Sequence, residues 1–149
     1  MPETEPPELS VVVVVVSDTT RPPDTGHLEP CLAALARQAG APSMEIIVPH
    51  LSATAGIDRL RVQFPQVHFL EIADVSGRSG SREHHDELRA RGLARARGGV
   101  VALTEDYGIP APDWAARMKG VAPDSKNHCI VKMVLLSVLS FARAFGRAP

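Results

Sequence analysis

Residues 100–107 read Val-Val-Ala-Leu-Thr-Glu-Asp-Tyr, an apolar strand that ends in two adjacent acids. Carboxylates are seldom buried without a partner, so their position directly after a core strand points to function rather than packing. In an open parallel sheet, the carboxyl ends of the strands border the crevice in which ligands bind. Glu105 and Asp106 are therefore candidate ligand-binding groups. Their oxygen donors suit Mg²⁺ or Mn²⁺ bridged to a phosphorylated ligand.

The chain upstream of this strand alternates between expected strands and helices. Runs of apolar, β-branched residues predict strands, and apolar residues three to four positions apart predict amphipathic helices. Such alternation is typical of an α/β fold, in which right-handed crossovers place helices on both faces of a mostly parallel sheet. In chain order we expect a strand at 11–16, a helix at 28–40, a strand at 44–48, a helix at 57–64, a strand at 67–72, a helix at 81–97 and the strand at 100–105.

The first and the fourth of these strands both carry polar residues where they end. Ser17 and Asp18 follow the valine run, as Glu105 and Asp106 follow the fourth strand. Because ligands bind outside the carboxyl ends of such strands, we expect all four side chains on one rim. Asp18 is a candidate ligand contact, and a turn residue that ends the strand is the alternative.

Composition limits the chain to one domain and a few classes of partner. Its 149 residues with 44% hydrophobic content can form one core, and a net charge of −1 gives no reason to expect nucleic-acid binding. Cys31 and Cys129 belong to no Cys/His cluster, which predicts reduced thiols and no zinc site. Residues 1–8 lack the features of a signal peptide. We interpret them as a flexible N-terminal tail of a cytoplasmic protein.

Six segments of the chain follow one another in a recognisable order. They are Leu9–Val16, Cys31–Leu35, Glu45–Val48, Gly92–Gly98, the acidic strand at 100–107 and Pro110–Trp114. In this order they resemble the family 2 glycosyltransferases with a GT-A fold, over roughly residues 8 to 118. The resemblance implies that residues 9–118 form a Rossmann-like nucleotide-sugar-binding half of such an enzyme.

The resemblance also implies a reaction and a set of ligands. The family moves a sugar from a nucleotide-diphosphate donor to a hydroxyl acceptor, with inversion at the anomeric carbon. By the same resemblance, Glu105 would contact the nucleotide, and Glu105 and Asp106 would hold a Mg²⁺ or Mn²⁺ ion that neutralises the departing diphosphate. Tyr107 stands where the family has a third acid. The acceptor and the catalytic base are not identified by any motif.

Further nucleotide contacts follow from the same resemblance. Ser17 and Asp18 occupy the place of a family loop that approaches the nucleotide, and Arg89 matches a position that faces the diphosphate. The planar fork of an arginine suits that role. The family's acidic contact to the base is replaced by the segment containing His50. His50 is a candidate for this contact, and a solvated loop histidine is the alternative.

Other conspicuous side chains have simpler explanations. Arg95 and Arg97 lie near the negative end of the helix at 81–97, where the helix dipole alone favours them. His84 and His85 are adjacent on that helix and point about 100° apart, so they cannot jointly bind one metal ion. Trp114 is expected to anchor the acidic loop to the core.

The last part of the sequence differs in character from the rest. All three lysines lie at or after position 119, and residues 130–145 are apolar on nearly every side. We interpret residues 119–149 as an atypical C-terminal tail with an apolar helix near 130–145. At 16 residues this helix is too short for a membrane span. It could instead pack on its own domain, support self-association, contact a membrane surface or be an out-of-frame tail.

Two functions from different classes stay open at this point. The first is a glycosyltransferase-family domain that binds a nucleotide-diphosphate sugar. It would be inactive if it is only the nucleotide-sugar-binding half of such an enzyme. The second is a non-catalytic, degenerate binding or assembly module, which Tyr107 and the replaced base contact favour. A Rossmann dinucleotide binder is less well supported, because no Gly-x-Gly-x-x-Gly follows the first strand.

Overall fold

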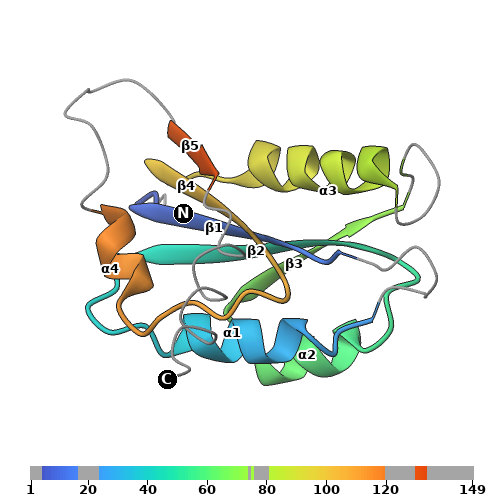
Figure 1. Cartoon of the computed structure of the whole chain (residues 1–149), viewed down its shortest axis with the longest axis horizontal. Coiled ribbons are helices and arrows are strands. Elements are labelled where there is room, and N and C mark those ends of the chain that lie inside the picture. The colour runs from blue at the N-terminus through green and yellow to red at the C-terminus, as the bar shows by residue number, and fades with distance from the viewer. Residues whose placement is uncertain (1–4, 17–23, 74, 76–80, 120–129, 134–149) are drawn as a thin grey trace, which may run out of the picture.

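A computed structural model describes residues 5–16, 24–73, 75, 81–119 and 130–133. Within them, five parallel strands form one sheet in the order β3-β2-β1-β4-β5, with helices on both faces (Figure 1). The expected Rossmann-like α/β fold is thus confirmed at this level. The elements are β1 (Leu9–Val14), α1 (Leu28–Ala36), β2 (Met44–Leu51), α2 (Ile57–Gln63), β3 (Val67–Ile72), α3 (Arg82–Arg95), β4 (Val100–Glu105), α4 (Trp114–Lys119) and β5 (Ile130–Met133).

The valine run forms the central strand β1, which is buried along its whole length. It pairs with β2 on one side and with β4 on the other. Alternate side chains point to opposite faces of a strand. Accordingly, Val11 and Val13 belong to one hydrophobic cluster, whereas Val12 and Val14 belong to a second.

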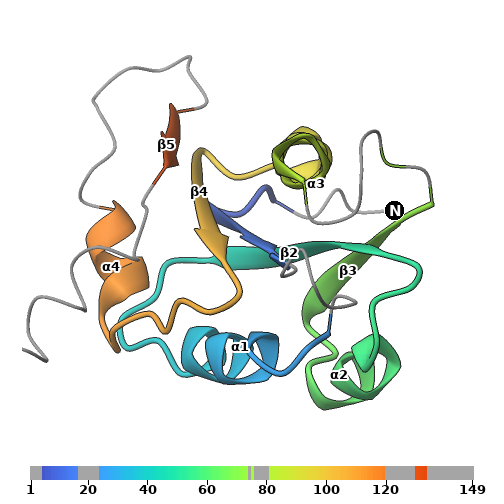
Figure 2. The same cartoon turned by 45° about the vertical axis from the view of Figure 1, so that its right-hand side comes forward.

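Each face of the sheet has its own helices. Figures 1 and 2 show α1 and α2 together on one face and α3 on the other. Leu28, Leu32 and Leu35 of α1 are buried in the first cluster, and Leu88 of α3 is buried in the second. Ser81 caps the N-terminus of α3, because its hydroxyl oxygen accepts a hydrogen bond from the backbone N–H of His84 at 3.3 Å.

Two glycines allow α3 and the turn after it to approach β1. A Cβ atom on Gly92 would lie 2.4 Å from Cγ1 of Val12, and one on Gly98 would lie 2.5 Å from the backbone nitrogen of Ser10. Both distances are shorter than van der Waals contact. The glycines of the segment Gly92–Gly98 therefore have a packing role.

A buried carboxylate ties β2 to the turn between α3 and β4. Oε1 of Glu45 accepts hydrogen bonds from the hydroxyl of Ser10 at 2.6 Å and from the backbone N–H of Arg97 at 2.8 Å. The Arg97 guanidinium reaches Oε2 at 3.2 Å, and the Ser10 hydroxyl oxygen in turn accepts from the N–H of Gly98 at 2.8 Å. Arg97 thus has a structural role, with Glu45 as its partner.

The end of the described chain corrects one expectation. Instead of beginning a helix, residues 130–133 form the strand β5, which lies parallel to β4. The rest of the range expected to be helical, 134–145, lies outside the described residues. A short helix that the sequence did not predict, α4, adds Trp114 and Ala115 to the first hydrophobic cluster, so the anchoring role of Trp114 is confirmed. None of the helices in the described part is long and apolar enough to cross a membrane.

Candidate functional site

The candidate site lies where the strand order reverses. From β1 the chain first adds β2 and β3 on one side, and it then returns to add β4 on the other. Val14 pairs with Glu105, and the N–H of Asp106 donates to the carbonyl oxygen of Val14 at 3.0 Å. Because ligands of open α/β sheets bind at such a reversal, the acidic pair stands at the position expected for a ligand site.

Glu105 faces α3 and forms an ion pair with Arg89. Nη2 of Arg89 donates to Oε1 of Glu105 at 2.7 Å, and Nη1 donates to Oδ1 of Asp86 at 2.9 Å. The Arg89 and Glu105 side chains are 22% and 21% exposed, so solvent still reaches this pair. The Tyr107 hydroxyl donates to the other oxygen of Glu105, and this hydrogen bond together with burial raises the pKa of the phenol to about 12.

Asp106 faces the opposite side of the sheet, toward α1. Its side chain is only 2% exposed, and its Oδ1 accepts a hydrogen bond from the backbone N–H of Val16 at 3.1 Å. Burial raises the pKa of this carboxyl from 3.8 to about 6, although the N–H of Val16 and the charge of His27 oppose the change.

The metal role predicted for the acidic pair does not fit this arrangement. Adjacent residues alternate across a strand, which sends Glu105 to Arg89 and Asp106 to Val16. Among the described residues, no three His, Cys, Asp or Glu side chains gather closely enough to hold a metal ion. The two carboxylates thus do not form one ion site here, and binding of Mg²⁺ or Mn²⁺ stays a prediction of the family resemblance.

His50 lies in a strand rather than in a loop. It is 3% exposed near the carboxyl end of β2, where its Nδ1 lies 2.9 Å from the carbonyl oxygen of Leu51 and its Nε2 lies 3.4 Å from Nη2 of Arg61. Burial lowers the pKa of this imidazole, and the charge of Arg61 lowers it further. The alternative of a solvated histidine is therefore wrong, whereas the contact to a base stays a prediction. Ser17 and Asp18 lie outside the described residues.

Three further side chains lie near the site, and the sequence did not assign them a role there. Nε2 of His85 is buried and has no hydrogen-bond partner in the described part of the chain, and burial lowers the pKa of its imidazole. Tyr107 is the direct partner of Glu105. Cys31 is a free, buried thiol, and burial together with the charge of Asp106 raises its pKa to about 12. Tyr107 and His85 had a sequence signal, since Tyr107 directly follows the acidic pair and His85 precedes Arg89 by one helical turn.

The raised pKa of Asp106 predicts a pH dependence of stability. The folded chain binds this proton more tightly than the unfolded chain, so stability should decline as the pH rises from about 4 to about 6. At pH 7 the replacement Asp106→Asn should raise the free energy of unfolding by about 1 to 2 kcal/mol, because a neutral amide replaces a buried charge. Urea unfolding between pH 4 and pH 7.5 measures both effects.

The exposed Asp58 provides the control for this prediction. Its side chain is 97% exposed, so Asp58→Asn should leave the pH profile of the wild type unchanged. Equal stability of Asp106→Asn and the wild type at every pH would contradict the predicted burial of a charge.

Comparison with known proteins does not assign a family. No family model matches this chain, and no curated protein is significantly similar to it in sequence. The resemblance to glycosyltransferases therefore rests on the motifs of the chain itself.

Proposed function

We propose that this chain is a nucleotide-diphosphate-sugar-binding domain of the glycosyltransferase type. The observation that carries the proposal is the Glu105–Arg89 pair, which lies at the carboxyl end of β4, beside β1, where the strand order reverses. The order of the sequence motifs supports the same assignment.

The two members of this pair suit different parts of such a ligand. A glutamate carboxylate accepts hydrogen bonds from ribose hydroxyls, whereas an arginine fork donates to two phosphate oxygens at once. Asp86, the second partner of Arg89, is 58% exposed, so this ion pair is weak and a diphosphate can replace it. Donor binding would then bring the nucleotide to Glu105 and the diphosphate to Arg89.

Transfer itself would follow the chemistry of the family. The hydroxyl oxygen of an acceptor attacks the anomeric carbon, the bond to the nucleoside diphosphate breaks, and the hydroxyl proton passes to a base. A divalent cation would stabilise the charge of the departing diphosphate.

A non-catalytic binding or assembly module is the second candidate. One observation favours it: both carboxylates already have partners within the protein, Arg89 and Tyr107 for Glu105 and the N–H of Val16 for Asp106. A site that is satisfied in this way is stable without a ligand.

Calorimetric titration with UDP-, GDP- and dTDP-sugars separates the two candidates. We expect at least one donor to bind with a dissociation constant below about 1 mM, and Arg89→Ala to weaken this binding by at least about tenfold, because a charged donor to phosphate is lost. Repeating the titration with Mn²⁺ tests the role of the cation. Glu105→Ala is expected to weaken binding as well.

Arg91→Ala is the matched control for Arg89→Ala. Arg91 lies on the same helix and forms an exposed ion pair with Glu87 at 3.4 Å. Its replacement should leave the affinity within about twofold of the wild type. The proposal fails if no donor binds at millimolar concentration, or if the two arginine variants weaken binding equally.

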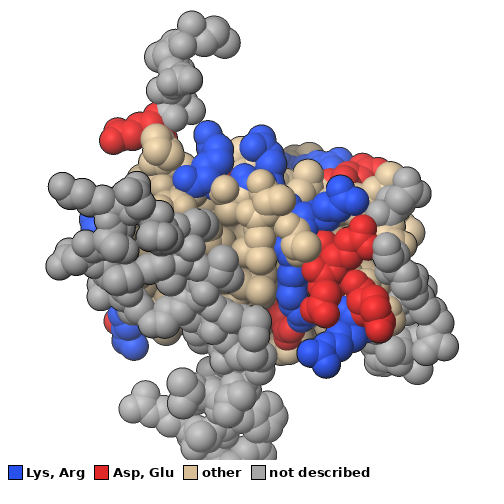
Figure 3. Space-filling view, turned by 90° about the horizontal axis from the view of Figure 1, so that it is seen from above, with Lys and Arg blue, Asp and Glu red and all other residues tan. Residues whose placement is uncertain are grey.

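The mixed charges on the surface of α3 favour a small anionic ligand over nucleic acid. Seen from above, acids and arginines interleave on this side of the molecule (Figure 3). Ion pairs between Arg82 and Asp86 and between Arg91 and Glu87 account for part of this pattern. An extended basic surface, which nucleic-acid binding requires, is not formed there.

A further inference from the structure

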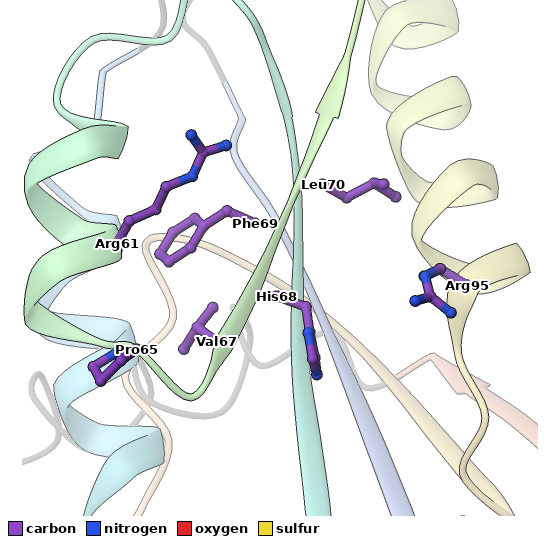
Figure 4. A pocket seen from close by; sticks show the side chains of 7 residues that line it. All are labelled: Arg61, Pro65, Val67, His68, Phe69, Leu70 and Arg95. Atoms are coloured by element: carbon purple, nitrogen blue, oxygen red, sulfur yellow. The ribbon is translucent and has the colours of Figure 1, made fainter. Parts of the chain in front are cut away.

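A groove runs along the outer edge of β3, away from the candidate site. Its volume is about 450 Å³. Figure 4 shows β3 between α2 and α3, with lining side chains from β3, from both helices and from the turn between α2 and β3. The lining residues are Arg61, Pro65, Val67, His68, Phe69, Leu70 and Arg95.

The floor of this groove is an open strand edge. β3 ends the sheet order and pairs with β2 alone, so backbone N–H and C=O groups along its other side have no strand partner in the described residues. Proteins often protect such an edge with proline or with charged side chains. Val67–Ile72 contains no proline or lysine, and its one Asp or Glu, Glu71, accepts a hydrogen bond from the hydroxyl of Ser52 at 2.7 Å. The edge can therefore accept another strand by backbone hydrogen bonds.

The walls of the groove are positively charged. Arg61 reaches in from α2 and Arg95 from the end of α3, on opposite sides of the strand (Figure 4). No acid lines the groove within the described residues. The exposed ion pair between Arg61 and Asp58, at 3.3 Å, is too weak to neutralise Arg61.

The position of the groove between two helices favours an extended peptide over a folded domain as its ligand. A strand that pairs with β3 would lie about 4.8 Å from it. A second copy of this chain would add its own α2 and α3 as well as a strand, so it needs more room beside β3 than a single extended peptide does.

We propose that this groove binds an extended acidic segment of a partner protein, which adds to the sheet as a strand beside β3. Backbone hydrogen bonds to β3 supply the alignment. Val67 and Phe69 on one face and Leu70 on the other contact apolar side chains of the segment. The two arginines attract its carboxylates and thus set the preference for acidic sequences.

Selection from a random twelve-residue phage-display library on the full chain tests this proposal. We expect the selected peptides to be acidic, with β-branched residues between the acids. A synthetic copy of the most enriched peptide, followed by fluorescence anisotropy, should bind at least about tenfold more weakly to Arg61→Glu and to Arg95→Glu. Binding should also slow deuterium exchange of the β3 backbone amides.

Arg37→Glu is the matched control. Arg37, like Arg95, is an exposed arginine at the end of a helix, but it lies outside the groove. Its reversal should change the affinity less than about twofold. The milder variants Arg61→Gln and Arg95→Gln repeat the test should a charge reversal disturb folding.

Three results would overturn the proposal. The first is a library that yields no acidic peptides. The second is equal weakening by Arg37→Glu and the groove variants. The third is peptide binding without protection of the β3 amides, which would show that no strand is added.

Discussion

Replacing Gly98 by alanine is expected to lower the free energy of unfolding by about 3 kcal/mol. The new Cβ atom would lie 2.5 Å from the backbone nitrogen of Ser10 and 2.8 Å from the carbonyl carbon of Leu9. Backbone atoms of a buried central strand cannot rotate away, as the end of a flexible side chain could. The clash must therefore push the turn before β4 away from β1, and urea unfolding measures the loss.

The neighbouring glycine provides the control. A Cβ atom on Gly99 would meet only the carbonyl oxygen of Glu8, at 3.8 Å, which is an ordinary contact. Gly99→Ala should thus change stability by less than about 1 kcal/mol, and in the stabilising direction, because alanine restricts the unfolded chain. Equal unfolding midpoints for the two variants would contradict the close approach of Gly98 to β1.

Removal of the buried carboxylate by Glu45→Ala should have a similar effect, a loss of about 3 kcal/mol. The variant would leave the Ser10 hydroxyl and the N–H of Arg97 without their acceptor. It would also free the Arg97 guanidinium, which is 45% exposed and can turn to solvent. Most of the loss therefore comes from the two uncharged donors, and denaturant unfolding at neutral pH measures it.

Glu45 also gives this prediction a pH dependence. Burial alone would raise the pKa of its carboxyl, but the hydrogen bonds from Ser10 and Arg97 together outweigh burial and hold the pKa below its ordinary value. The stabilisation is therefore present above the pKa of the unfolded chain and is lost as the pH falls through the lower pKa of the folded chain. The wild type should lose stability over this acid range relative to Glu45→Ala.

Glu71 is a matched control for Glu45. It too accepts a hydrogen bond from a serine hydroxyl, that of Ser52 at 2.7 Å, but this bond is exposed. Water can replace it, so Glu71→Ala should cost less than about 1 kcal/mol. A loss as large as that of Glu45→Ala would show that burial is not the reason for the effect.

The sequence predicted the fold well because its signals are local. The valine run, the apolar spacing of α1 and the serine before α3 each specify their element within a few residues. β5 was missed because the apolar segment that contains it has no polar alternation to distinguish a strand from a helix. Pairing with β4, a long-range contact, decides its structure.

The candidate site could be predicted only in part. Its place at the end of β4 follows from topology, and the separation of Glu105 from Asp106 follows from strand alternation, provided that the strand geometry continues past Glu105. It does continue, because the N–H of Asp106 still bonds to Val14. The contacts of Glu45 with Arg97 join residues 52 positions apart, and no local pattern reveals such a pair.

The central position of β1 also determines when the fold can be completed. This strand lies at the start of the chain, yet one of its two partners, β4, begins only at Val100. During synthesis, β1 can pair with β2 early and must then wait until most of the domain has left the ribosome. Because parallel pairing over such long separations is slow, docking of β4 on β1 is the expected rate-limiting step of folding. Until then, one whole edge of the most hydrophobic strand stays open to chaperones and to other chains.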